Sequence, residues 1–256
     1  MALTVTWLGQ SGLLMAGDGR IVLIDPWLSP HPERATPPPQ LEWPNRIDLL
    51  LITHGHGDHL DLDGLKGLAK HIQIAEIAAP IPHLAAIEAA LPAIPRVGVR
   101  PHFTLDRLGG IAVLPAWHGV TAADGYGPMI GADGASPHVG YFFTLGGMRI
   151  YVSGDTLADD ALLGMVRPWQ PQLMFLPVNG HDSSREARGI LGNMSAAEAL
   201  EFAIAAGAST LVPLHHDGVT GNTADIGEIA RAAQGRPMHL LLPARSIPFV
   251  LDGTLP

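Results

Sequence analysis

Cysteine is absent from this chain of 256 residues, which excludes disulfide bonds and thiolate metal ligands. Any metal ion must therefore bind through nitrogen and oxygen atoms. Charged residues are also few, at 15%, and the formal net charge of −9 comes without any block of Lys and Arg. The lack of a basic block argues against a surface that follows a nucleic-acid backbone.

Long apolar segments are missing as well. No stretch reaches the roughly 18 unbroken apolar residues of a membrane span, and no basic amphipathic helix suggests a membrane surface. Residues 1–7 have neither the basic nor the apolar region of a signal peptide. These absences predict a cytoplasmic protein whose partner is a small molecule rather than a nucleic acid or a membrane. The 47% of hydrophobic residues is enough for a large core.

The most distinctive feature that is present is the segment 53–59, THGHGDH, directly after the apolar run 49–52. The run predicts a buried strand that leads into a loop with three histidines and an aspartate. Imidazole nitrogens and a carboxylate this close together are typical of a divalent-metal site, and the glycines allow the backbone to fold around the ions. The segment therefore predicts a metal site at the end of a strand.

The rest of the chain alternates short apolar strands with stretches of helical spacing, which predicts an α/β (α+β) class with sheets flanked by helices. The expected strands are 3–8, 13–16, 20–24, 49–52, 111–115, 140–145, 149–152, 173–176, 210–212 and 240–242. The expected helices are 62–72, 82–91, 157–169, 196–206 and 224–233. The helix 196–206 has the clearest signals, because Ser195 and Glu198 form a capping box and Gly207 follows as a C-terminal cap.

Two segments echo each other across the chain. In 19–25 and in 147–155, a glycine turn leads into an apolar strand that ends near an aspartate. This weak repeat predicts two similar halves, about 1–135 and 136–256, that pack face to face. Because no linker separates the halves, we expect a single domain over 1–256.

One segment, 26–46, breaks the pattern. It is rich in proline and has no periodicity, which is typical of a functional or mobile loop in a compact domain. Because the segment follows Asp25, which we expect near the metal site, two interpretations stay open. The loop is either a lid or wall of the site, or an excursion over the surface.

Three further candidates lie just past apolar strands, where α/β enzymes place catalytic residues. These are His118, Asp155 and His215. A lone histidine after a strand is more often structural. Together with the segment 53–59, however, the three residues complete the seven ligands that two metal ions require.

The order of these motifs, H-x-H-x-D-H, then a histidine, then G-D-T, then P-x-H, resembles the metallo-β-lactamase superfamily of hydrolases. The resemblance extends from 7–12 and 24–26 to the last strands. Within the superfamily, the segments 179–182, 188–195 and 213–217 most resemble the L-ascorbate-6-phosphate lactonase branch. The resemblance implies a four-layer αββα sandwich with two divalent metal ions at one edge.

The resemblance also assigns the seven ligands to two positions that share one carboxylate: His54, His56 and His118 for the first metal, Asp58, His59 and His215 for the second, and Asp155 between them. Asp25 would orient a ligand histidine or the loop backbone. Oxygen-reducing di-iron relatives have a glutamate where this chain has His56, which favours hydrolysis over redox chemistry. Affinity order favours zinc, with manganese and iron as alternatives.

Five residues in or near the matching segments are candidates for substrate contacts: Asn179, His181, Arg185, Arg188 and Tyr126. Arg188 could bind a phosphate or carboxylate with two hydrogen bonds, or it could form a surface salt bridge. His216, beside the ligand His215, is interpreted as pocket lining or as a proton donor. The lactonase carries additional sequence around its first motif, so the pocket walls of this chain are expected to differ.

The predicted reaction follows from the charge of two divalent ions, which lower the pKa of a shared water and produce a metal-bridging hydroxide. Asp58 could accept the proton of that water. The expected substrate is a small ester or lactone, with or without a phosphate group. A phosphodiesterase of the same fold and a non-catalytic metal-binding sensor or scaffold are the alternatives. Helices rich in alanine and leucine could pack against a second copy in a homo-oligomer.

Overall fold

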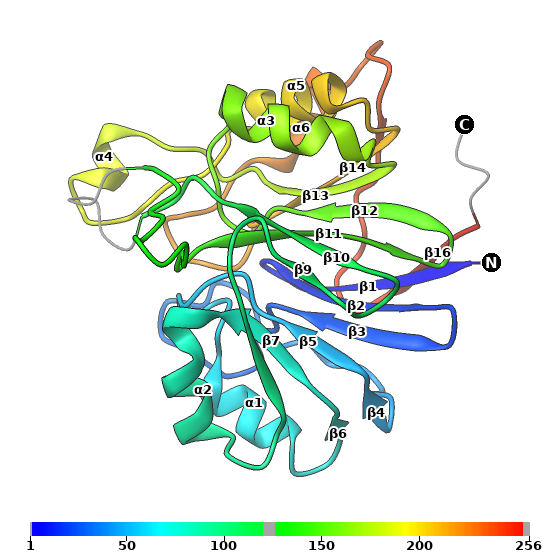
Figure 1. The fold of residues 1–256 in the computed structure, drawn as a ribbon. Coiled ribbons are helices and arrows are strands. Elements are labelled where there is room, and N and C mark those ends of the chain that lie inside the picture. Colours follow the sequence, from blue (N-terminus) through cyan, green and yellow to red (C-terminus); the bar gives the residue numbers. More distant parts are fainter. Residues whose placement is uncertain (1, 120–125, 253–256) are drawn as a thin grey trace.

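The computed structural model describes residues 2–119 and 126–252. Two seven-stranded sheets pack face to face, and helices cover the outer face of each sheet (Figure 1). This arrangement is a four-layer αββα sandwich, so the predicted fold is confirmed. Within the described residues, no helix is long and apolar enough to cross a lipid bilayer.

The first sheet is built mostly from the N-terminal part of the chain. In spatial order its strands are β16 (Pro248–Leu251), β1 (Leu3–Gly9), β2 (Gly12–Gly17), β3 (Arg20–Ile24), β5 (Leu49–Leu51), β7 (Ile77–Pro80) and β8 (Arg96–Val99). Strands β16 to β3 pair antiparallel, and β3 to β8 pair parallel. All of β5 is buried, as expected for a parallel strand that is covered on both faces.

The second sheet follows the same plan. In spatial order its strands are β15 (His239–Leu240), β14 (Thr210–Leu214), β13 (Leu173–Pro177), β12 (Met148–Val152), β11 (Val139–Leu145), β10 (Ile111–Pro115) and β9 (Thr104–Leu105). Strands β9 to β12 pair antiparallel, and β12 to β15 pair parallel. The short strands β4 (Arg46–Ile47) and β6 (Gln73–Ile74) form a separate pair.

The helices form the two outer layers. They are α1 (Leu62–Leu68), α2 (Leu84–Ala90), α3 (Asp160–Val166), α4 (Ser183–Glu186), α5 (Ala196–Ala206) and α6 (Ile226–Ala232), with 3₁₀ turns η1 (Ile81–His83) and η3 (Arg167–Trp169). Helices α1 and α2 cover the first sheet, whereas α3, α5 and α6 cover the second (Figure 1). The capping box of Ser195 and Glu198 begins α5, and Gly207 ends it at a φ of +80°.

The main hydrophobic core lies between the two sheets. Leu13 and Ile24 of the first sheet and Tyr141 and Phe143 of the second belong to one buried cluster. One further hydrophobic cluster lies under the helices of each outer layer. Burial on both faces of each sheet stabilises the strands, and it leaves their ends to present functional residues.

Each strand and helix that the sequence predicts overlaps an observed element. The sequence did not predict β7, β8 and β16, whose segments IAAP, RVGV and PFVL contain residues that are uncommon inside strands. These strands form because each one pairs with a neighbouring strand of the first sheet. Tertiary pairing therefore outweighs weak local preference here.

The predicted boundary between the two halves near residue 135 does not coincide with the division of the strands between the two sheets. Strands β9 and β10 precede that position but belong to the second sheet, and β16 returns to the first. The repeat itself is visible in the topology, because β3 and β12 each pair antiparallel on one side and parallel on the other. The single domain over 1–256 stays a prediction.

Candidate metal centre

The loop 53–59 begins just after β5 and turns back sharply. The amides of His59 and Leu60 both donate to the carbonyl of His56, at 2.9 and 2.8 Å. Gly55 leaves no room for a side chain, because a Cβ there would collide with the ring of His83. The glycine therefore permits close packing that brings the motif histidines together.

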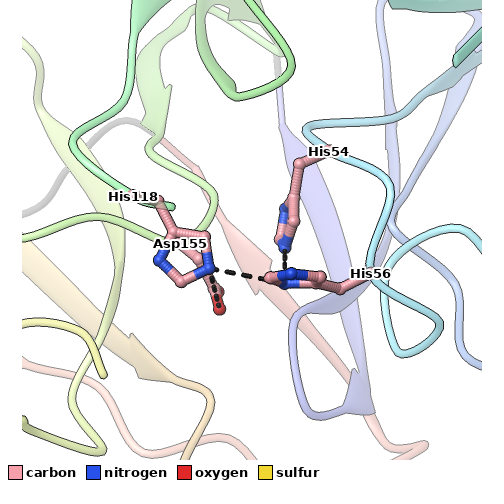
Figure 2. A group of neighbouring side chains, drawn as sticks. All are labelled: His54, His56, His118 and Asp155. Carbon is pink, nitrogen blue, oxygen red and sulfur yellow. Dashed lines mark hydrogen bonds and ion pairs between the residues drawn. The ribbon is translucent and has the colours of Figure 1, made fainter. Parts of the chain in front are cut away.

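The first ligand cluster contains His54, His56, His118 and Asp155, whose side chains converge in Figure 2. His54 Nε2 and His118 Nε2 lie 2.9 and 3.4 Å from His56 Nδ1. Each residue offers one ligand atom, and these atoms all lie within 4.8 Å of one another. The spacing is close enough for one ion to bind all four residues, which come from three separate parts of the chain.

The second ligand cluster contains Asp58, His59 and His215. Asp58 Oδ2 lies 3.3 Å from His215 Nε2 and 3.8 Å from His59 Nε2. His59 and His215 are buried, with 0% and 3% of their side chains exposed. This cluster offers a second ion a carboxylate and two imidazoles.

Asp155 lies between the two clusters. Its Oδ1 is 3.2 Å from His59 Nε2, and its Oδ2 is 3.1 Å from His215 Nε2 and 3.8 Å from His118 Nε2. The preceding Gly154, at a φ of +62°, packs so tightly against Thr53 that a Cβ would lie 2.7 Å from the threonine side chain. The loop after β12 therefore rests directly on the histidine motif and brings the carboxylate to both clusters.

The donor atoms fit a bound metal. His59 Nε2 and Asp155 Oδ1 are buried, and neither makes a hydrogen bond among the described residues, although they face each other at 3.2 Å. Buried polar atoms almost always make a hydrogen bond, so two facing atoms that make none fit a site that holds a cation. Imidazole and carboxylate donors suit zinc, iron or manganese.

Burial decides the charge of the first cluster. Burial and the neighbouring histidines hold the pKa of His54 well below its ordinary value. Burial also lowers the pKa of His118 to about 3. Both imidazoles are therefore neutral near pH 7, which is the form that binds metal.

Carboxylates decide the charge of the second cluster. Burial alone would lower the pKa of His215, but Asp155 and Asp58 raise it to about 9. The same carboxylates, with Asp25, raise the pKa of His59 well above its ordinary value against the effect of burial. Burial would raise the pKa of Asp58, yet the imidazoles of His59 and His215 lower it. Without metal, this cluster is a network of buried ion pairs.

Asp25 supports the motif from behind. Its Oδ2 lies 2.8 Å from His59 Nδ1, and its carboxylate accepts hydrogen bonds from the amide and the hydroxyl of Thr53. Because Asp25 engages Nδ1, it turns His59 Nε2 towards the cluster. The carboxylate thus contacts both a ligand histidine and the loop backbone.

A cavity of about 270 Å³ opens onto both clusters. Its floor is formed by candidate ligands from the two clusters: His56, Asp58, His118, Asp155 and His215. Its walls come from three loops: Trp27, His31 and Glu33; Gly189, Ile190 and Leu191; and Val219 and Asn222. The first wall belongs to the proline-rich segment 26–46, so this loop is a wall of the site rather than an excursion.

The predicted substrate contacts lie around this cavity but do not line it. Arg185 donates to the carbonyls of Asn179 and Gly180, and its Nε pairs with Asp182 at 3.1 Å. Asn179 is buried and donates to Asn222 Oδ1 at 2.9 Å, so it supports a wall residue. Arg185 therefore stabilises the loop that carries the second wall, whereas Asn179 contacts the third wall at Asn222.

The other three candidates are also engaged elsewhere. His181 Nε2 lies 3.3 Å from Glu198 Oε1, and Arg188 Nε donates to the carbonyl of Ser184 at 3.2 Å. The hydroxyl of Tyr126 contacts Glu186 and accepts from the amide of Gly192. Gly192 follows the wall residues 189–191, so Tyr126 supports the cavity from outside.

His216 does not belong to the cavity lining. Its ring packs against that of Trp7, with the ring centroids 4.9 Å apart, and burial lowers its pKa. This position does not support the predicted role in pocket lining or proton donation.

Besides the wall residues, Gln10 and His138 lie beside the ligand clusters and were not predicted from the sequence. Gln10 is 1% exposed and contacts both Asp58 and His215. His138 is 2% exposed, and its ring lies 5.2 Å from that of His118. Neither belongs to a local metal-binding motif, although Gln10 lies in the segment 7–12 that contributes to the resemblance.

Comparison with known proteins shows which family this chain resembles. A family model described as the Beta-lactamase superfamily domain matches residues 20–216. A UPF0173 metal-dependent hydrolase from Archaeoglobus fulgidus is 31% identical over 217 residues, which covers 83% of each chain.

Two solved structures have the same fold. Igni18, a metallo hydrolase from Ignicoccus hospitalis, matches with a TM-score of 0.69 and 19% identity, covering 98% of this chain and 99% of its own. An isothiocyanate hydrolase from Delia radicum gut bacteria matches with a TM-score of 0.71 and 18% identity, covering 96% and 98%. The family model and the archaeal relative together show that this chain belongs to the UPF0173 family of metal-dependent hydrolases in the metallo-β-lactamase superfamily.

Proposed function

We propose that this protein is a binuclear hydrolase of a small, unphosphorylated ester, with a lactone as the preferred type. The observation that carries the proposal is the pair of ligand clusters, which meet at Asp155 on the floor of one cavity. The preference for a lactone rests on the resemblance to the lactonase branch.

Two bound divalent ions would activate a water at neutral pH and polarise the ester carbonyl. The chain's own residues then have distinct tasks. Asp155 holds the two clusters at a constant separation, and Asp58 accepts the proton that the attacking water releases. Gln10 donates to Asp58 Oδ2 at 2.7 Å and so restricts the rotation of this carboxylate. His59 is oriented by Asp25 and stays in place during turnover.

The cavity supports a small substrate. Its volume of about 270 Å³ lies near the lower end of the range for small-molecule sites. Ile190 and Leu191 make one wall apolar, Val219 adds an apolar side chain to a second wall, and Trp27 adds an aromatic face to the third. A small ester with an apolar part suits these walls better than a polymer does.

Charge supports an ester without phosphate. Among the described residues that line the cavity, none is Lys or Arg, whereas Glu33 adds a carboxylate to the wall. Arg34 lies over the Trp27 ring at 4.4 Å and donates to the Trp27 carbonyl, so it is engaged within the loop. Among the described wall residues, a phosphorylated substrate would find no Lys or Arg to pair with.

The test combines metal analysis with substrate screening. The protein, as purified and after loading with zinc or manganese, is assayed with lactones, simple esters, their phosphorylated counterparts and bis(p-nitrophenyl) phosphate. We expect two metals per chain and turnover of unphosphorylated esters or lactones. His56→Ala should abolish turnover, whereas His71→Ala, which changes an exposed histidine outside both clusters, should not.

Three results would contradict the proposal. Turnover of the phosphodiester alone would indicate a phosphodiesterase. Two bound metals without turnover of any ester would indicate a sensor or scaffold. Fewer than two metals under every loading condition would exclude the binuclear site.

A further inference from the structure

Gln10 occupies a strained position in the turn between β1 and β2. Its φ is +51°, in the left-handed region that non-glycine residues seldom adopt, and its side chain is almost fully buried. Glycine or asparagine would adopt this backbone conformation more easily. A glutamine at this position therefore suggests that its side chain makes contacts that outweigh the strain.

The side-chain amide has one orientation. Its Oε1 accepts from the amide of Gly218 at 3.0 Å, so its Nε2 must face the opposite way. There Nε2 lies 2.7 Å from Asp58 Oδ2 and 2.9 Å from His215 Nε2. Both are atoms of the second ligand cluster.

The backbone of Gln10 also forms hydrogen bonds with the loop after β14. Its carbonyl accepts from the amide of His215 at 3.1 Å, and its amide donates to Asp217 Oδ1 at 3.0 Å. His215 itself has a φ of +59°, so this ligand also depends on its neighbours for its backbone conformation. Gln10 thus contacts His215 through both its main chain and its side chain.

Gly218 leaves space for the side-chain amide of Gln10. A Cβ at Gly218 would collide with the Gln10 side chain, so the glycine allows the close approach. The turn after β1 and the loop after β14 are therefore complementary, although 208 positions separate Gln10 from Gly218 in the sequence. Their contact places the Gln10 side-chain amide, which donates to Asp58 Oδ2, beside His215 Nε2.

We propose that Gln10 is a positioning residue that holds Asp58 and His215 in register and thereby sets the affinity of the second metal position. This inference rests on the proposed two-metal function. The first cluster is assembled by the loops after β5, β10 and β12, so its affinity should be independent of Gln10.

Two variants test the proposal. Gln10→Asn keeps the amide and suits the positive φ, but its shorter side chain cannot reach Gly218, Asp58 and His215 together. Gln10→Met keeps the length and removes all three polar contacts. Gln234→Asn, at an exposed turn, is the matched control. Each metal-free protein is titrated with Co²⁺, followed by its visible absorption and by competition with a chromophoric chelator.

We expect wild type and Gln234→Asn to bind two Co²⁺ ions. In both Gln10 variants one Co²⁺ should bind as in wild type, while the affinity for the other falls by about 10- to 100-fold. The metal-free melting temperature of Gln10→Asn should fall less than that of Gln10→Met, because asparagine adopts the positive φ with less backbone strain.

Unchanged affinity for both ions would overturn the inference, as would an equal loss at both positions accompanied by a lower melting temperature. The latter result would indicate a purely structural role. Wild-type protein that binds only one Co²⁺ would instead overturn the two-metal proposal on which the inference depends.

Discussion

The two ligand clusters lie side by side and share Asp155, yet they offer a metal ion different surroundings. The first cluster has three imidazoles, and burial keeps two of them, His54 and His118, neutral near pH 7. The second has two imidazoles next to Asp58 and Asp155, which raise the imidazole pKa values. The first position is therefore ready for a metal, whereas the second must release protons to bind one.

This difference suggests how one site can combine firm metal binding with proton handling. Neutral imidazoles at His54 and His118 bind a metal without having to release protons near neutral pH. A cluster rich in carboxylates gives a place for protons next to the substrate cavity, where Asp58 is 16% exposed. Substitutions in the first cluster, in the second cluster or at the shared Asp155 should distinguish metal binding from proton handling.

The largest effect is expected from Asp155→Asn, because Asp155 serves both clusters. Loss of its charge should lower the content of both metals and reduce kcat/KM for ester hydrolysis by about 10³-fold or more. Elemental analysis and steady-state assays measure both quantities, with Asp160→Asn as an exposed control. Full retention of either metal would show that the carboxylate is not shared.

The next largest effect is expected on the stability of the metal-free protein, which should differ between variants of the two clusters. His59→Ala leaves the carboxylate of Asp25, which is 1% exposed, without its imidazole partner. Removing one member of a buried pair costs about 3–5 kcal/mol, so the free energy of unfolding should fall by that order. His56→Ala, at the cavity floor, should cost less. Denaturant unfolding of the two chelated variants measures the difference, and equal losses would contradict the comparison.

The pH dependence of metal-free stability tests the second cluster. The pKa of His215 is raised from 6.5 to about 9, so its ion pairs contribute fully below about pH 6.5. That contribution is lost as the pH rises through about 9, and it amounts to at most about 3 kcal/mol. The melting temperature of chelated protein should therefore fall between these pH values. With zinc bound the imidazoles are neutral throughout, so the fall should be absent. A flat metal-free profile would contradict the charge assignment.

The smallest effect concerns metal choice. Imidazole-rich sites suit zinc, whereas carboxylates suit manganese better. The first position should therefore prefer zinc over manganese more strongly than the second, by a few-fold. Competition between Zn²⁺ and Mn²⁺ in His56→Ala and in Asp58→Ala, followed by Mn²⁺ electron paramagnetic resonance, measures each preference. The same preference in both variants would show that the clusters do not differ in this respect.

The sequence was most informative where chemistry is local. The segment 53–59 contains four ligand candidates in one loop, and Asp155 and His215 follow strands that are recognisable from their apolar residues. The capping residues of α5 predicted its ends correctly because capping depends on neighbours within one turn.

The sequence was least informative where contacts are distant. Gln10 meets His215 across more than 200 positions, and no periodicity indicates that pairing. Trp27 and Glu33 were expected only as part of a loop, since their place on the wall depends on pairing between 33–35 and 218–220. Arg185 matched a functional segment, yet local carbonyls occupy its guanidinium. Residue type alone did not distinguish residues that support the cavity walls from residues that line the cavity.

A crystal structure of the metal-loaded protein, with anomalous scattering recorded at the metal edge, would test the binuclear centre most directly. We expect two peaks, one among His54, His56 and His118 and the other among Asp58, His59 and His215, with the Asp155 carboxylate between them. A single peak, or a second peak away from Asp58, His59 and His215, would contradict the central claim that two clusters form one binuclear centre.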